Sequence, residues 1–246
     1  MKPISMEQVL SLSCAKQHFQ DCYLVASLNA LSRCKKGQEI LQNNIRSDGI
    51  AYTVRFNNVK GKSETYLVRQ EECDSLILCD RCLNVIPITK PHNPIVKVIE
   101  VAMSKLLKAH PEEKPLISRI PNSNEIFEFN KPSKFLYMFT GVNPIIINEN
   151  GISITLKKYQ NAVENIFKRI AEDKNSCFVA GTAISNLEFA NFHCYPIVAT
   201  AKYLINKQQY HVNLYDTREQ TIIERHSNSI INNMKYICGY FGDMLK

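Results

Sequence analysis

The chain has 246 residues, of which 45% are hydrophobic and 22% are charged, so it can bury a sizeable core in one large domain or two closely joined lobes. Its formal net charge is +7, and the lysines and arginines are spread along the chain without forming a basic stripe with interleaved aromatics. A nucleic-acid partner is therefore not expected, and no apolar run approaches the roughly 18 residues that predict a membrane span.

The amino-terminal sequence and the cysteine count predict the cellular compartment of the protein. Residues 1–12 are interrupted by Glu7 and lack the long apolar core of a secretory signal. Nine cysteines are an odd number, and their spacing is not that of a disulfide framework. We therefore expect free thiols in a reducing compartment, the cytoplasm, either of the producing cell or, after delivery, of another cell.

The first predicted helix covers residues 22–34 and begins at a cysteine. Its apolar side chains recur at helical spacing: Leu24, Val25, Leu28 and Leu31. Asp21 is expected to be the N-cap, which places Cys22 in the first turn. The positive end of a helix lowers the pKa of a thiol, and the thiolate is the reactive form. Cys22 is therefore the candidate nucleophile.

A hairpin and a second helix are predicted next. Residues alternate in polarity over 52–56 and 65–69, with a polar connection between them, and a third strand is expected over 75–78. Residues 94–110 predict a helix that starts at Pro94. Its apolar face comprises Ile95, Val98, Ile99, Ala102 and Leu106.

The pattern changes near residue 140. Residues 117–134 are polar and turn-rich, and the apolar residues 136–141 close this stretch. Residues 156–171 then predict a helix, followed by short strands over residues 177–182, 193–204, 209–215 and 221–224. A helix-rich first half and a strand-rich second half predict an α+β fold of two lobes, residues 1–140 and 141–246, with a cleft between them.

A cysteine nucleophile needs a base within hydrogen-bond reach and a third group that orients the base. Of the six histidines, His193 is favoured because it begins a strand at the lobe edge, whereas His211 lies inside a strand, where a histidine is usually packed. The next strand offers Asp216 at its end and Asn213 inside it, and either side chain can accept a hydrogen bond from an imidazole N–H. Taken alone, Asp216 fits an ordinary turn aspartate.

Residues 21–28 resemble the active-site helix of calpain-type cysteine proteases, particularly of their bacterial relatives, in which an Asp-Cys-aromatic triplet opens the helix. Similar segments follow in the order of that family: residues 94–110, the turn at 139–141, the His-Cys-Tyr at 193–195 and the strand that ends at Asp216. The resemblance covers roughly residues 10–225, and its specificity comes from the order and spacing of motifs that are each modest alone.

The resemblance implies a papain-like fold in which a helical lobe carries Cys22 and a β-rich lobe carries His193 and Asp216. It implies that Cys22 attacks a carbonyl carbon, that His193 takes the thiol proton and later protonates the leaving amine, and that Asp216 orients His193. Gln17 would donate to the oxyanion alongside the backbone N–H of Cys22.

The chain departs from the family pattern in three ways. Gln17 lies five residues before Cys22, where the family usually has six, and Lys16 occupies the sixth position. Gln20 replaces the glycine that precedes Asp-Cys in the family. Asp216 replaces an asparagine, and no tryptophan follows to shield the histidine from water, because the chain contains none.

A zinc site and a calcium site are both disfavoured. Cys79 and Cys82 form a Cys-x-x-Cys with Cys73 and His92 nearby, but a second cysteine pair at ligand spacing is missing, so an ordinary turn is preferred. Calcium is possible through the resemblance, since animal calpains bind it in acidic loops. The nearby acidic residues lack such a loop spacing and are expected to form a solvated face: Glu71, Glu72, Asp74 and Asp80. No cofactor is expected.

The leading functional hypothesis is a cytoplasmic cysteine endopeptidase that acts on a protein or peptide substrate. The same triad and thioester would also serve deamidation, acyl transfer or cleavage of isopeptide bonds on ubiquitin-like tags. A degenerate protease that acts as a binding module is a third possibility, although Cys22 and His193 are both retained. Substrate preference and oligomeric state are left open at this point.

Overall fold

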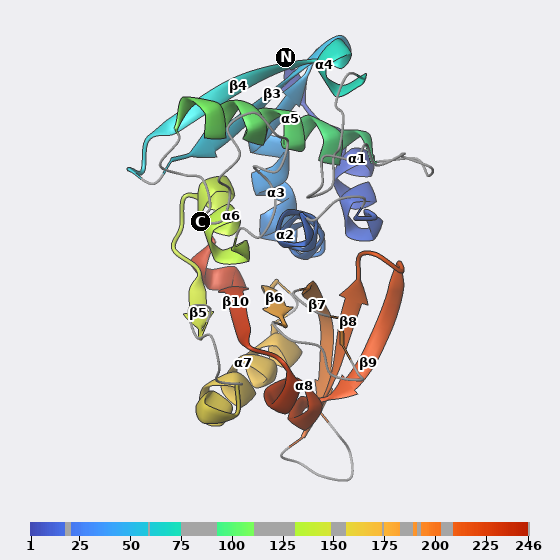
Figure 1. Cartoon of the computed structure of the whole chain (residues 1–246), viewed down its shortest axis with the longest axis vertical. Helices are drawn as coiled ribbons and strands as arrows, with labels where there is room; N and C mark the ends of the chain where they lie inside the picture. Colours follow the sequence, from blue (N-terminus) through green and yellow to red (C-terminus); the bar gives the residue numbers. More distant parts are fainter. Residues whose placement is uncertain are drawn as a thin grey trace, which may run out of the picture.

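The computed structural model describes residues 1–17, 21–58, 60–74, 93–110, 131–148, 156–173, 175–182, 189–190, 193–202 and 209–245. Within these residues, helices and strands form an α+β fold with two antiparallel sheets, one at each end of the view in Figure 1. The predicted α+β class is confirmed.

The first sheet belongs to the amino-terminal half. Its strand order is β1 (Lys2–Pro3), β2 (Ile45–Ser47), β3 (Ala51–Asn57) and β4 (Ser63–Arg69), and β4 leads into the short helix α4 (Gln70–Asp74). The predicted hairpin is confirmed, with Val54 of β3 opposite Tyr66 of β4. The second predicted helix is also confirmed as α5 (Pro94–Ala109), which packs against β3 and β4.

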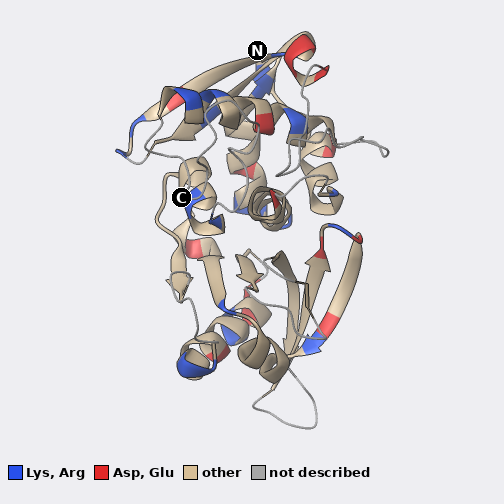
Figure 2. Cartoon of the chain, in the orientation of Figure 1, with Lys and Arg blue, Asp and Glu red and all other residues tan. Residues whose placement is uncertain are grey.

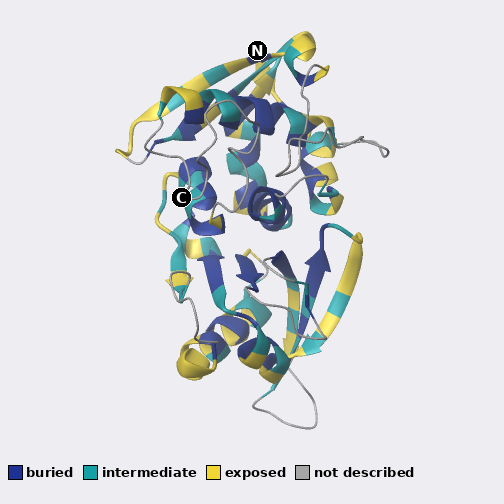
Figure 3. Cartoon of the chain, viewed as in Figure 1, coloured by how far each residue is buried: buried dark blue, intermediate teal, exposed yellow. Residues whose placement is uncertain are grey.

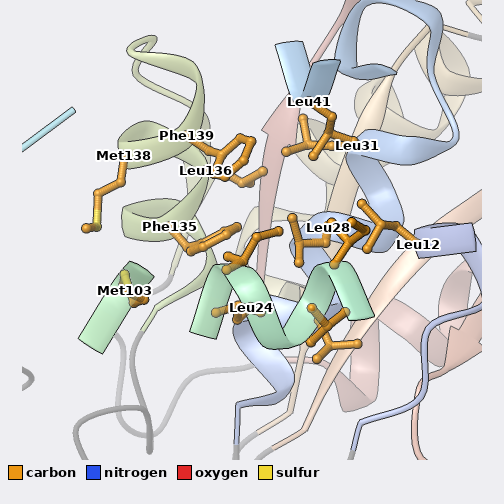
Figure 4. Close-up of a cluster of buried hydrophobic side chains, with 14 of the residues drawn as sticks. Leu12, Leu24, Leu28, Leu31, Leu41, Met103, Phe135, Leu136, Met138 and Phe139 are labelled. Carbon is orange, nitrogen blue, oxygen red and sulfur yellow. The ribbon is translucent and has the colours of Figure 1, made fainter. Parts of the chain in front are cut away.

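Helix α2 (Cys22–Ser32) lies between the two sheets, and every residue after Cys22 in it is buried (Figures 1 and 3). A helix that is apolar on all sides needs neighbours on all sides. It is surrounded by a 3-10 helix over Leu12–Cys14 that follows α1 (Met6–Ser11), by α3 (Lys35–Asn44), by α6 (Pro132–Thr140) and by the second sheet. Figure 4 shows part of the resulting core, to which α6 contributes Phe135, Leu136 and Phe139.

The second sheet is built from the carboxy-terminal half, and all its neighbouring strands are antiparallel. Two helices, α7 (Gln160–Glu172) and α8 (Ser227–Asn233), pack against it, and short 3-10 helices occupy Leu156–Tyr159 and Gly242–Met244. The strand order is β5 (Ile145–Ile147), β10 (Tyr236–Tyr240), β6 (Cys177–Gly181), β7 (Cys194–Lys202), β8 (Tyr210–Asp216) and β9 (Thr221–His226).

Strand β6 separates two hydrophobic cores. Cys177 and Val179 belong to the core that contains α2, whereas Phe178 and Ala180 belong to the core that contains α7 and α8. Because successive side chains of a strand point to opposite faces, β6 is buried on both of its faces. Helix α2 packs on one of these two faces, and it contacts both β6 and β7.

The structure differs from the predicted elements in several places. Helix α6 begins at Pro132, inside the stretch predicted to be turn-rich, because proline suits a first helical turn. It ends at Thr140 and is followed by Gly141, whose φ is 73°. The first half is rich in helix, as predicted, but it also holds a four-stranded sheet. Strand β10 and helix α8 were not predicted, and the strand expected over 75–78 lies outside the described residues.

Lysine and arginine are mixed with aspartate and glutamate over both halves of the molecule, whereas α2 itself carries no charged residue (Figure 2). None of the described helices has the length and apolarity to cross a membrane. The predicted lobe boundary near residue 140 falls between the end of α6 and the start of β5.

Candidate active site

The structure brings three of the predicted site residues together. Cys22 is the first residue of α2, His193 immediately precedes β7, and Asp216 is the last residue of β8. Strands β7 and β8 are antiparallel neighbours, so the start of one lies beside the end of the other. The His193 Nε2 and Asp216 Oδ1 atoms are 3.2 Å apart, and both side chains are buried.

Asp216 is held as a carboxylate. Its Oδ1 atom also accepts hydrogen bonds from the backbone N–H groups of Arg218 at 2.9 Å and Glu219 at 3.3 Å. Burial raises the pKa of this carboxyl, but the hydrogen bond and charge of His193, with the N–H and guanidinium of Arg218, lower it to about 2. The other candidate orienting residue, Asn213, lies earlier in β8, opposite Ala199 and Glu224.

Cys22 is the one residue of α2 that is not fully buried. It makes a thiol–thiol contact with Cys194, in which the two Sγ atoms are 3.6 Å apart. That hydrogen bond lowers the pKa of Cys22 most, burial raises it, and the hydrogen bond and charge of His193 lower it further, to about 5 from an ordinary 9.0. Cys22 is therefore a thiolate at neutral pH.

His193 lies between the other two groups. Burial lowers its pKa, but the hydrogen bonds with Asp216 and Cys22 outweigh burial and raise the pKa above the ordinary 6.5. Because Nε2 faces Asp216, Nδ1 is the nitrogen that remains for the thiol. A thiolate–imidazolium pair backed by a carboxylate is the arrangement that this geometry stabilises.

The histidine is shielded from water without a tryptophan. Its ring is 2% exposed, and the edge of the Tyr195 ring packs against it with centroids 4.6 Å apart and an interplanar angle of 87°. Tyr195 lies two residues after His193, which is the spacing at which residues of a strand share a face. The expected loss of shielding is therefore wrong, because burial and Tyr195 supply it.

Gln17 lies beside the loop that follows Asp216. Its backbone N–H donates to the Thr217 carbonyl at 2.8 Å, and its side-chain oxygen accepts from the Thr217 hydroxyl at 3.3 Å. Two further bonds, from Tyr215 and Gln220 to the carbonyl of Cys14, tie the same segment to the end of β8. Gln17 is thus fixed near the triad, and its role at an oxyanion stays a prediction.

The predicted N-cap position is confirmed, because Asp21 directly precedes Cys22, the first residue of α2. The Asp21 side chain makes no capping hydrogen bond, however, and is fully buried. It contacts Glu100 of α5 instead, and Glu100 is itself 2% exposed. Burial raises the pKa of Glu100 to about 7, against the lowering effects of Asp21 and Lys97. A carboxyl–carboxylate pair therefore includes the residue that precedes Cys22.

Sequence reasoning missed Cys194 and Tyr236 at this site. The Cys194 Sγ and Tyr236 Oη atoms are 2.9 Å apart, and Cys194 contacts Cys22 as described above. The contact depends on the pairing of β10 with β6 and of β6 with β7. Strand pairing over such sequence distances leaves no local pattern that could have indicated either contact.

The other candidate residues lie elsewhere. Of the remaining described histidines, His110 pairs with Glu64, His211 pairs with Glu224, and the ring of His226 packs against that of His211. Residues 18–20, 79–82 and 92 lie outside the described residues, which removes most of the considered zinc set from view.

In the part of the chain that the structure describes, no group of three histidine, cysteine, aspartate or glutamate side chains is arranged to hold a metal ion. Glu72, a member of the acidic cluster considered for calcium, instead pairs with Lys105 at 2.7 Å.

No protein-family model matches the chain, and the search of curated proteins also finds no match. The functional argument therefore depends on the residues and geometry described above.

Proposed function

We propose that the protein is a cysteine endopeptidase with a papain-like arrangement of two lobes, residues 1–140 and 141–246. The observation that carries this proposal is the buried contact between His193 and Asp216 beside a partly exposed Cys22 at the N-terminus of α2. The ordered resemblance to calpain-type proteases supports the same assignment. A binding module would have no need of this three-residue alignment.

In the proposed reaction, the Cys22 thiolate attacks the carbonyl carbon of a peptide bond. The negative charge that develops on the carbonyl oxygen is stabilised by the backbone N–H of Cys22, in the first turn of α2, and by the side chain of Gln17. His193 then donates its proton to the leaving amine nitrogen as the C–N bond breaks, leaving a thioester on Cys22.

A water molecule completes the cycle. His193, now neutral, takes a proton from the water as its oxygen attacks the thioester carbon, and the thiolate of Cys22 leaves. Asp216 keeps the ring oriented and stabilises its charged form throughout. These steps need free thiols and no cofactor, and the cysteines in the described part of the chain are free. We therefore place the activity in a reducing compartment such as the cytoplasm.

The test is labelling with a peptidyl epoxide followed by intact mass measurement. We expect a single adduct, lost completely in Cys22→Ala, because the reactive thiolate is at Cys22. Cys14→Ala is the matched control, since Cys14 is the more exposed thiol yet lies outside the triad. Labelling scattered over several cysteines and unchanged in Cys22→Ala would overturn the proposal. Peptide products from a protein substrate then distinguish cleavage from the small mass change of deamidation.

The orienting residue is tested by two substitutions. Asp216→Asn is expected to lower kcat/KM by about tenfold, because the two backbone N–H donors would hold the amide oxygen where Oδ1 now faces His193. Asp216→Ala removes the acceptor and is expected to lower kcat/KM by roughly 10² to 10³. The measurement is hydrolysis of a fluorogenic peptide, and equal losses in the two variants would contradict the assigned role.

A further inference from the structure

Cys194 places a second thiol against the nucleophile. The Sγ atoms of Cys22 and Cys194 are 3.6 Å apart, and both residues are free cysteines. Their exposure differs, because Cys194 is only 4% exposed whereas Cys22 is partly open to solvent. A small oxidant can therefore reach Cys22 first. A disulfide bond has an S–S length of about 2 Å, so its formation needs only a small further approach of the two Sγ atoms.

Tyr236 completes this thiol pair. Tyr236 on β10 lies opposite Gly181 on β6, and Gly181 lies opposite Cys194 on β7. The Tyr236 ring crosses over Gly181, where a Cβ atom would overlap the ring. The hydroxyl thereby reaches the sulfur of Cys194, at 2.9 Å from Oη to Sγ. A glycine in the central strand thus allows a hydroxyl to contact the second sulfur.

We propose that Cys194 is a resolving cysteine, which captures Cys22 after oxidation by a hydroperoxide and forms a reversible Cys22–Cys194 disulfide that switches the site off. The inference rests on the proposed function only in taking Cys22 as the reactive thiolate. It adds a modification site and the chemical class of its co-substrate, a hydroperoxide.

The first step oxidises Cys22. The thiolate attacks one oxygen of hydrogen peroxide, the S–O bond forms, the O–O bond breaks, and the leaving hydroxide takes the proton of the His193 imidazolium to give water. The Cys22 sulfur loses two electrons to the peroxide and becomes a sulfenic acid. This product carries no negative charge, and it has lost the nucleophilic sulfur needed for acyl transfer.

The second step joins the sulfurs. The Cys194 sulfur attacks the Cys22 sulfur, the S–S bond forms, the S–O bond breaks, and the leaving hydroxide takes the Cys194 proton to give water. The two steps together convert two thiols and one hydroperoxide into one disulfide, one water and the reduced co-product. A dithiol reductant reverses the change by thiol–disulfide exchange and is itself oxidised to a disulfide.

The surroundings of Cys194 control its pKa, and thereby determine when the second step can occur. Burial raises its pKa well above the ordinary value, and the hydrogen bond and negative charge of the Cys22 thiolate raise it further. Oxidation of Cys22 removes that charge, while the hydrogen bond from Tyr236 continues to lower the pKa. Cys194 therefore stays an inert thiol while Cys22 is active and becomes more acidic once Cys22 is oxidised.

The test uses the full-length protein, treated with hydrogen peroxide and then analysed without reductant by intact mass and peptide mapping. We expect a mass loss of two hydrogen atoms and a linked pair of peptides containing Cys22 and Cys194. Dithiothreitol should then restore epoxide labelling of Cys22 almost completely. Cys194→Ser keeps a similar volume and a hydroxyl donor, and it should lose the linked peptides and fail to recover labelling, because Cys22 proceeds to sulfinic acid.

Cys177→Ala is the matched control. Cys177 is a buried thiol on β6 that also faces a second thiol, Cys34. Its replacement therefore tests whether disulfide formation is specific to the Cys22–Cys194 pair. The Cys22–Cys194 link should form unchanged in this variant. Oxygen addition at Cys22 without a link to Cys194, or a link that forms first between other cysteines, would overturn the inference. The mass loss and the linked peptides can be measured without peptidase activity. The disulfide can therefore be absent while Cys22 labelling and peptide cleavage persist, or present while cleavage is absent, so the two proposals can be distinguished.

Discussion

Replacing His193 by glutamine is expected to lower kcat/KM for a peptide substrate by roughly 10³-fold, because it removes the group that protonates the leaving amine. That loss corresponds to about 4 kcal/mol of transition-state stabilisation. Glutamine can still donate to Asp216, so the buried carboxylate keeps a partner and the fold is preserved. The effect is therefore expected in catalysis and not in folding.

The same variant should shift the pH dependence of Cys22 labelling. In the unmodified protein, the pKa of about 5 means that the rate of labelling rises with pH through pH 5 and is then level, because the thiolate is lost only below that pH. Without the hydrogen bond and charge of His193, the pKa of Cys22 rises and the midpoint moves to higher pH. Alkylation rates measured from pH 4 to 9, with unfolding curves as a check on folding, provide the measurement.

His211→Gln is the matched control for His193→Gln. His211 also lies in the second sheet and also pairs with a carboxylate, Glu224, at 2.8 Å, but it lies away from Cys22. Its replacement should change kcat/KM by less than about twofold. If both histidine variants lose activity equally, or if the labelling midpoint stays near pH 5 in His193→Gln, the assignment of His193 as the base is wrong.

Glu100→Gln is expected to stabilise the protein at pH 8 by about 3 kcal/mol and to have little effect near pH 4. The pKa of Glu100 is raised from 4.5 to about 7 in the folded protein. The folded state thus retains a proton that the unfolded chain releases, and stability that is present below pH 4.5 is lost as the pH rises through 7. Glutamine is uncharged at every pH and can still donate to Asp21, so the variant avoids this loss.

Urea unfolding at pH 5 and pH 8 measures this effect. The difference in the free energy of unfolding between Glu100→Gln and the unmodified protein should be several-fold larger at pH 8. Glu39→Gln is the control, because Glu39 forms an exposed pair with Lys36 and its loss should change stability by no more than about 0.5 kcal/mol at either pH. An equal difference at both pH values would mean that Glu100 is ionised in the folded protein at pH 5.

Part of the fold follows from local patterns. The helices at Cys22–Ser32 and Pro94–Ala109 were predicted because apolar side chains recur at helical spacing and proline or a helix-start residue marks the first turn. The hairpin of β3 and β4 was predicted from alternation and a polar connection. Helix α6 was not predicted, because residues 117–134 are polar and resemble a loop in sequence, whereas in the structure α6 packs against α2.

Part of the candidate site was also accessible from residue types and order. Cys22 was chosen by its place at a helix start, His193 by its place at a strand start, and Asp216 by its place at the end of the next strand. These positions are local properties, and the structure places the three residues together. The position of Asp21 at the helix start was also predicted, but its burial against Glu100 was not, because that contact depends on α5, which begins more than 70 residues later.

The sequence by itself therefore determined which residues could be a nucleophile, a base and an orienting group, since each of those roles depends on residue type and the nearest element. Only the tertiary structure decided what surrounds them: Cys194 and Tyr236 against the nucleophile, Tyr195 over the histidine and Glu100 behind Asp21. The physical reason is that the contacts of Cys194, Tyr236 and Glu100 arise from strand pairing and helix packing between segments far apart in the chain. Such contacts leave no periodicity in the sequence of either segment.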